Sequence, residues 1–180
     1  MARPLVVAAG NPMAGDDGLG YCVGRVLEDC VESRDFDVLV LTALDPGVAA
    51  YLEGRDRVVF VDAVDPSSLP GGARLAVYEL DPGRLSLEEL TEALLDVSSH
   101  EPNPVNILLV ARASGVFSGR AALVGLRVWR VELGSGLSRE ACGLLEKGAR
   151  EVLRVIGSGA RLDTSCVTRV ARRECGCESL

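Results

Sequence analysis

One stretch near the start of the chain decides the fold: Leu5-Val6-Val7-Ala8-Ala9-Gly10-Asn11-Pro12-Met13-Ala14-Gly15-Asp16-Asp17-Gly18-Leu19-Gly20. Its first residues form an apolar run typical of a buried strand, and its glycines mark a turn. Apolar side chains then recur at helical spacing from Leu19 to Cys30. A strand, a glycine-rich loop and a helix therefore follow one another. This places Asp16 and Asp17 at the carboxyl end of a strand, where open α/β sheets bind their ligands.

The rest of the chain continues this alternation of strands and helices. We expect strands at 38–41, 58–61, 74–80 and 123–133, and helices at 46–53, 87–97, 104–113 and 138–156. Asn103 and Ser138 are the predicted N-caps of the last two helices. The strands at 38–41 and 58–61 are continuously apolar, as in a sheet that helices cover on both faces. The link between the strands at 58–61 and 74–80 is too short for a parallel return, so the strand at 74–80 is predicted to be antiparallel.

Size and charge limit the classes of function. The chain has 180 residues and a net charge of −7, so no basic field is available to bind nucleic acid. No apolar run is long enough to span a membrane. The first residues lead directly into a strand, which predicts no signal peptide and a cytoplasmic protein. We expect one α/β domain over residues 1–156 and a polar, arginine-rich, poorly packed tail over residues 157–180.

The six cysteines are interpreted as thiols because the protein is expected to be cytoplasmic. Cys22 and Cys30 lie on the apolar stripe of the first helix and are predicted to be core residues. The tail holds three more cysteines close in sequence, Cys166, Cys175 and Cys177. A metal site there is a minor alternative, because only three thiols are present and no fourth ligand is near.

Three polar residues carry the predicted chemistry. Asp17 follows the first strand, Asp62 ends the strand at 58–61, and His100 precedes the helix at 104–113. Two carboxylates and one imidazole suit a divalent transition metal with open coordination positions. Taken singly, each has an ordinary explanation as a cap, a turn residue or a solvated side chain. Asp16 and Asp65 are candidates for supporting positions around them.

Four blocks of the chain resemble, in order, motifs of the hydrogenase maturation endopeptidases, which trim the C-terminal extension of nickel-iron hydrogenase large subunits. The blocks are Gly10-Asn11 through Asp17-Gly18-x-Gly20, then Val61-Asp62-Ala63-Val64 with Pro70-Gly71, then Ser98-x-His100 followed by Leu123-Val124-Gly125, and finally Gly136-Leu137-Ser138. The resemblance covers about residues 4–156. The chain departs from the family in having Asp17 where many members have glutamate, and in an additional segment at 81–97.

The resemblance implies a fold, a site and a substrate. The fold is a three-layer α/β/α sandwich of the phosphorylase/hydrolase-like kind, around a five-stranded mixed sheet with one antiparallel strand. Asp17, Asp62 and His100 correspond to the family's metal-recognition and catalytic residues, and the enzyme is classed as an aspartyl-type endopeptidase. The nickel is carried by the substrate precursor, and another divalent metal can take its place in vitro. The implied partner is the nickel-iron hydrogenase large-subunit precursor, with no nucleic acid and no membrane.

Other interpretations remain open at this point. Hydrolysis can proceed through a metal-polarised carbonyl or a carboxylate-activated water, and the sequence does not choose between them. A relative that binds metal-loaded partners, or acts as their chaperone, without cutting them would carry the same residues. A nucleotide- or phosphate-binding module is disfavoured because Asp16 and Asp17 would repel phosphate at the start of the helix. A peptidyl-tRNA hydrolase also continues its first strand with Gly-Asn-Pro, but its basic surface and nearby histidine are missing here.

Overall fold

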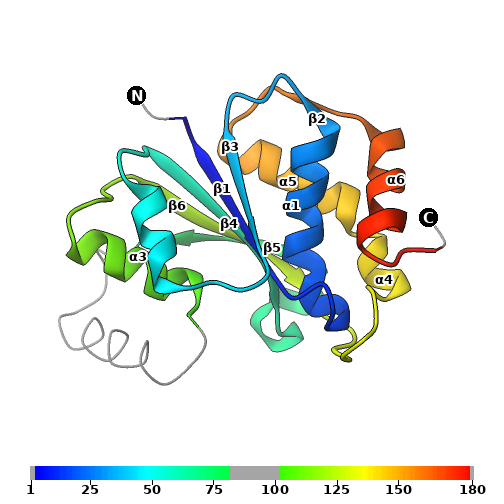
Figure 1. Ribbon diagram of the computed structural model, residues 1–180. Coiled ribbons are helices and arrows are strands. Elements are labelled where there is room, and N and C mark those ends of the chain that lie inside the picture. The colour runs from blue at the N-terminus through cyan, green and yellow to red at the C-terminus, as the bar shows by residue number, and fades with distance from the viewer. Residues whose placement is uncertain (1–2, 82–101, 179–180) are drawn as a thin grey trace.

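The computed structural model describes residues 3–81 and 102–178 and shows a mixed five-stranded sheet at the centre of the molecule (Figure 1). In spatial order the strands are β3 (Asp37–Leu41), β1 (Leu5–Ala9), β4 (Arg57–Val64), β6 (Arg120–Arg127) and β5 (Leu75–Leu80). β3, β1, β4 and β6 are parallel, and β5 pairs antiparallel with β6. The predicted antiparallel strand is therefore confirmed. It lies at the sheet edge, beside β6 rather than β4.

Helices cover both faces of the sheet, as the apolar strands predict. One face packs against α1 (Leu19–Cys30), α4 (Arg139–Cys142) and α5 (Leu145–Ile156). The other packs against α3 (Pro104–Ala113) and the 3₁₀ helix Pro46–Leu52. A hydrophobic core lies on each face of the sheet, and alternate residues of β1 contribute to them. Val6 and Ala8 belong to the core that includes α1, and Leu5 and Val7 to the core that includes α3. The predicted α/β/α sandwich is confirmed.

Several element boundaries differ from the sequence-based expectation. β6 ends at Arg127, not near residue 133, because the chain then turns to meet the loop after β1. The helix predicted at 138–156 is divided into α4 and α5, and the segment at 46–53 is a 3₁₀ helix. Asn103 and Ser138 cap α3 and α4 as predicted, Asn103 accepting from the N–H of Val105 at 2.9 Å. The helix predicted at 87–97 lies outside the described residues.

The C-terminal segment is packed against the domain, so the expectation of a poorly packed tail is wrong. The short strand β7 (Arg161–Leu162) pairs antiparallel with β2 (Val31–Glu32). α6 (Thr164–Glu174) then packs against α1 and α5, on the side of α1 that faces away from the sheet (Figure 1). Its apolar stripe was visible in the sequence as Val167, Val170 and Ala171, which are buried.

Three disulfides join this segment to the domain, so the expectation of free thiols is also wrong. They link Cys22 to Cys175, Cys30 to Cys166, and Cys142 to Cys177. All six cysteines are buried, which confirms the predicted core position of Cys22 and Cys30. Because every thiol is paired, the tail cysteines form no metal site. An ion pair adds to the attachment, with Arg25 Nε 2.6 Å from Glu174 Oε2.

None of the helices formed by residues 3–81 and 102–178 has the length and hydropathy that a membrane span requires.

Candidate functional site

The loop after β1 folds back on itself and holds Asp17 against the end of the strand. At Gly10, which has a φ of +152°, a Cβ atom would lie 2.2 Å from the carbonyl oxygen of Asp17. At Gly18, a Cβ atom would lie 2.8 Å from the Cα of Pro12. The N–H of Asn11 donates to Asp17 Oδ2 at 3.3 Å. The glycines therefore allow backbone approaches that side chains would prevent, and they bring Asp17 back to the carboxyl end of β1.

Asp62 lies at the same edge of the sheet, on the neighbouring strand. The register pairs Ala8 of β1 with Val61 of β4, so Asp62 is the next residue along. At Gly20, in the first turn of α1, a Cβ atom would lie 2.0 Å from the Ala9 oxygen and 3.0 Å from the Asp62 Cα. The start of α1 is thus pressed onto the end of β1 and onto Val61 and Asp62 of β4. Asp17, three residues before Gly20, and Asp62 therefore lie at the same edge of the sheet.

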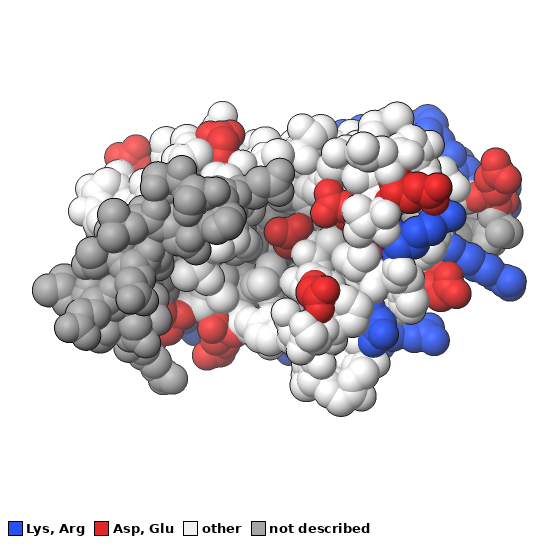
Figure 2. Space-filling view, turned by 90° about the horizontal axis from the view of Figure 1, so that it is seen from below, with Lys and Arg blue, Asp and Glu red and all other residues white. Residues whose placement is uncertain are grey.

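Asp17 and Asp62 are both half-buried. Asp62 Oδ1 accepts from the N–H of Ala63 at 2.8 Å. Figure 2 views the molecule from below, toward the carboxyl ends of the parallel strands. Separate acidic side chains lie across this face, while most of the basic side chains in view gather at one end. This surface favours cations over anions, which agrees with the argument against a phosphate site.

Asp16 has a different role from its neighbour. Its side chain is fully buried and accepts four hydrogen bonds. Oδ2 accepts from the N–H of Trp129 at 2.8 Å, the N–H of Arg130 at 2.9 Å and the hydroxyl of Ser138 at 2.9 Å. Oδ1 accepts from the N–H of Ser138 at 2.7 Å. Asp16 therefore holds the loop after β6 and the start of α4 against the loop that carries Asp17.

Backbone hydrogen bonds extend this attachment along the two loops. The N–H of Gly15 donates to Ser135, that of Asp16 to Arg130, and that of Gly134 to Met13. Exposed apolar side chains lie on the paired loops: Met13 and Val131 are each 63% exposed and Leu133 is 82% exposed. The C-terminal segment supports the same loop, because the N–H of Leu137 donates to the Cys175 oxygen at 3.0 Å.

Asp65, the other candidate for a supporting position, caps a turn. Its Oδ1 accepts from the N–H of Ser67 at 2.8 Å and from the Ser67 hydroxyl at 2.5 Å. The hydroxyl bond is the main reason that the pKa of Asp65 is lowered from its ordinary value. These two bonds account for an exposed aspartate at this position.

His100 lies outside the described residues, but α3, which follows it, is placed. Near the C-terminal end of α3, Arg112 donates to the Gly119 oxygen at 3.0 Å, just before β6 begins. α3 therefore runs antiparallel to β6, and over its ten residues it rises about 15 Å. Its first residue, Pro104, consequently lies toward the edge that carries Asp17 and Asp62.

A metal site is expected from three donors, of which the structure places two. Within residues 3–81 and 102–178, no group of three or more His, Cys, Asp and Glu side chains is arranged to hold a metal ion. Asp17 and Asp62 are oxygen donors at one edge, and the sequence contains one histidine, His100. A metal site that combines these two carboxylates with the imidazole stays a prediction.

No protein-family model and no curated protein sequence matches the chain. Among solved structures, the hydrogenase maturating endopeptidase HybD from Escherichia coli matches with a TM-score of 0.65 and 21% identity, over 91% of this chain and 99% of that one. A hydrogenase 2 maturation peptidase from a Thaumarchaeota archaeon matches with a TM-score of 0.61 and 28% identity, over 86% and 98%.

A third match is the [NiFe] hydrogenase maturation protease HycI from Thermococcus kodakarensis KOD1, with a TM-score of 0.56 and 25% identity, over 87% of this chain and 94% of that one. These three neighbours are peptide hydrolases by name, and each matches over nearly its full length. The chain has the fold of the hydrogenase maturation endopeptidases and is similar to several of them over most of its residues.

Proposed function

We propose that this chain is an endopeptidase that removes the C-terminal extension of a nickel-iron hydrogenase large-subunit precursor after recognising the inserted nickel. The observation that carries the proposal is the convergence of Asp17 and Asp62 at the carboxyl edge of β1 and β4. It occurs in a fold whose solved relatives are hydrogenase maturation endopeptidases.

The nickel belongs to the substrate in this proposal. Asp17, Asp62 and His100 supply oxygen and nitrogen donors that are too few to saturate a transition metal, so thiolates of the precursor complete its coordination. The ion then links enzyme and precursor, and a precursor without nickel loses that part of its binding free energy. The same donors accept another divalent transition metal in vitro.

The same geometry supports hydrolysis. A carboxylate at this edge can accept a proton from the attacking water, and no nucleophilic serine or cysteine is needed. All six cysteines are in disulfides. The exposed side chains of Met13, Val131 and Leu133 provide an apolar surface next to the carboxylates, against which the precursor's chain can lie.

The partner and compartment follow from the same proposal. The partner is the large-subunit precursor, and a net charge of −7 argues against nucleic acid. A cytoplasmic location is part of the proposal. It is compatible with the three disulfides in organisms whose intracellular proteins are rich in them, as in hyperthermophiles.

The test is to incubate the purified chain with nickel-loaded and nickel-free precursor and to measure the precursor's mass. We expect shortening of the nickel-loaded form alone, and its loss in a His100→Ala variant that folds normally. Equal cutting of both forms would exclude nickel recognition. Binding of the loaded precursor without cutting would identify a binding-only protein.

A further inference from the structure

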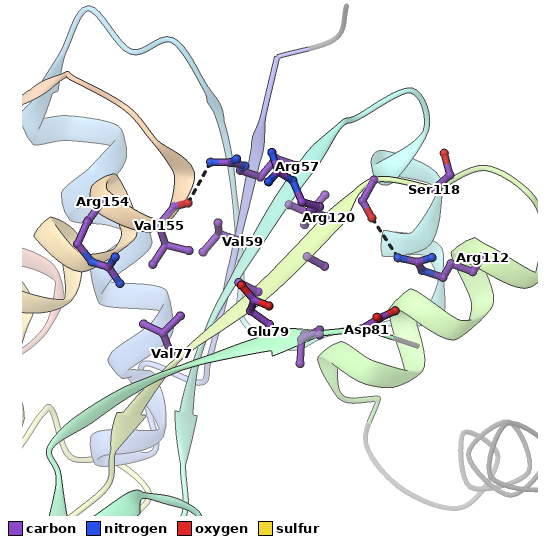
Figure 3. Close-up of a pocket in the computed structure, with 15 residues that line it drawn as sticks. Arg57, Val59, Val77, Glu79, Asp81, Arg112, Ser118, Arg120, Arg154 and Val155 are labelled. Atoms are coloured by element: carbon purple, nitrogen blue, oxygen red, sulfur yellow. Dashed lines mark hydrogen bonds between the residues drawn. The ribbon is translucent and has the colours of Figure 1, made fainter. Parts of the chain in front are cut away.

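A cavity of about 520 Å³ opens where β4 and β6 begin (Figure 3). Its lining includes Arg57 and Arg120, the first residues of β4 and β6. Asp62 is five residues along β4 from Arg57, a separation of about 16 Å in an extended strand. The cavity is therefore separate from the proposed proteolytic site.

Four arginines from four different elements line the cavity: Arg57 of β4, Arg112 of α3, Arg120 of β6 and Arg154 of α5. Two carboxylates, Glu79 and Asp81, line it as well. Positive charge is thus in excess, in a protein whose overall charge is −7. Such a concentration of guanidinium groups contrasts with the acidic face at the other edge.

The pairing register makes the arrangement unusual. Arg57 and Arg120 are directly paired on adjacent parallel strands, so their side chains leave the same face of the sheet. Like charges at paired positions repel one another. Although Glu79 lines the same cavity, it forms no ion pair with either arginine in the described part of the chain. The repulsion therefore lacks compensation from this carboxylate.

The hydrogen bonds already made by the arginines leave donors unused. Arg57 Nη1 donates to the oxygens of Val155 and Ile156, at 3.3 and 3.1 Å, and so caps the end of α5. Arg112 Nε is buried and has no hydrogen-bond partner within residues 3–81 and 102–178. The Arg120 side chain is exposed and makes no hydrogen bond or ion pair to the described residues.

The floor between these groups is apolar. Val59 of β4, Val77 of β5, Ala122 of β6 and Val155 of α5 contribute to it. A cavity of this size is within the range of small-molecule sites, which combine apolar walls with a few polar groups that orient the ligand. Planar guanidinium groups match the oxygens of carboxylates and phosphates, and they bind them through paired hydrogen bonds.

We propose that this cavity binds a small organic oxyanion, a carboxylate or phosphate group attached to an apolar body. The oxyanion lies between Arg57 and Arg120 and relieves their repulsion, and the apolar body covers Val59 and Val77. Arg112 extends the basic rim on the side of α3. Arg154 contributes less, because it is already paired with Glu151 at 2.6 Å.

The test is isothermal titration calorimetry of the full chain with phenyl phosphate, benzoate and inorganic phosphate. We expect at least one aromatic anion to bind more tightly than inorganic phosphate, and the comparison of phenyl phosphate with benzoate identifies the preferred headgroup. Removing one charged donor weakens such binding by roughly tenfold or more, which is the effect expected for Arg120→Gln. Glu79→Gln should tighten binding, because it removes a carboxylate from the cavity.

Arg150→Gln is the matched control. Arg150 is an exposed arginine of α5 that pairs with Glu146 and does not line the cavity, so its loss should leave binding unchanged. The proposal is overturned if neither aromatic anion binds at millimolar concentration, if inorganic phosphate binds as tightly as both, or if Arg120→Gln has no more effect than Arg150→Gln. No precursor is present in the experiment, so its failure is independent of the proposed proteolytic function.

Discussion

Asp16 and Asp17 are neighbours in sequence, and replacing each by asparagine should have opposite consequences. In Asp16→Asn, the amide oxygen can take the position of Oδ2 and keep the bonds from Trp129, Arg130 and the Ser138 hydroxyl. The amide nitrogen then faces the N–H of Ser138, where Oδ1 accepts at 2.7 Å in the native protein. Two donors then meet in a buried place, and at least one of them is left unsatisfied.

The expected loss of stability follows from these bonds. One unsatisfied buried donor costs about 1–3 kcal/mol, and each of the other bonds loses roughly 1 kcal/mol when its acceptor is no longer charged. We therefore expect Asp16→Asn to lower the free energy of unfolding by about 4–6 kcal/mol. Asp17 is half-buried and accepts one long bond, at 3.3 Å from Asn11, so Asp17→Asn should cost less than about 1 kcal/mol.

Guanidinium denaturation followed by tryptophan fluorescence measures both changes. Trp129 is the one tryptophan of the chain, and its backbone N–H is bonded to Asp16. The folded fraction of Asp16→Asn should still process nickel-loaded precursor, whereas Asp17→Asn should be stable and inactive. An Asp16→Asn variant as stable as the native protein, or an Asp17→Asn variant equally destabilised, would refute the division between a structural and a functional carboxylate.

Three further predictions concern the framework around the site. The pKa of Glu174 is lowered from 4.5, chiefly by its hydrogen bond from Arg25, so this pair should stabilise the fold above about pH 4.5 and lose that contribution as the pH falls further. In urea unfolding between pH 5 and 3, the free energy of unfolding should therefore fall less for Glu174→Gln than for the native chain. An equal fall in both proteins would contradict this. Gly20→Ala places a Cβ atom 2.0 Å from the Ala9 oxygen and should cost at least about 2–3 kcal/mol, measured by thermal unfolding against Gly143→Ala, where the nearest atom is 3.5 Å away and little change is expected. Because all six cysteines are in disulfides, the unfolded, unreduced chain should react with no iodoacetamide, and the reduced chain should gain the mass of six equivalents. Reduction should also lower the melting temperature. Reaction with iodoacetamide before reduction would show free thiols.

Local patterns predicted most of the fold. The apolar run at Leu5 and the helical spacing from Leu19 depend on neighbouring residues alone, and both elements form as expected. The antiparallel direction of β5 followed from the length of a single link. The caps Asn103 and Ser138 are likewise local, and both were predicted correctly.

Features that depend on distant residues were missed. Pairing of Cys22 with Cys175 spans 153 residues, and no spacing rule connects them. The packing of α6 was missed for a different reason. Arginines flank its apolar residues, so the segment was interpreted as a polar, poorly packed tail. Asp163, which accepts from the N–H groups of Ser165 and Cys166 and caps the helix, was a readable signal.

The candidate site, which stays a prediction, also combines local features with long-range ones. Local sequence places Asp17 after β1 and Asp62 near the end of β4, two residues before the strand ends, and the parallel register brings both to one edge. The burial of Asp16 depends on Ser138, 122 residues away, so neighbouring sequence could not distinguish it from Asp17. The paired arginines at the opposite edge also required the register of β4 and β6.

The most direct test of the central claim compares Asp62, near the end of β4, with Asp65, in the turn that follows β4. Nickel-loaded precursor is incubated with Asp62→Asn and with Asp65→Asn, and the rate of shortening is measured by mass spectrometry. Asp65 is exposed and caps a turn, so Asp65→Asn should process at close to the native rate, whereas Asp62→Asn should be folded and lose processing by at least about a hundredfold. Native rates for Asp62→Asn would contradict the assignment of the working carboxylates to this edge of the sheet.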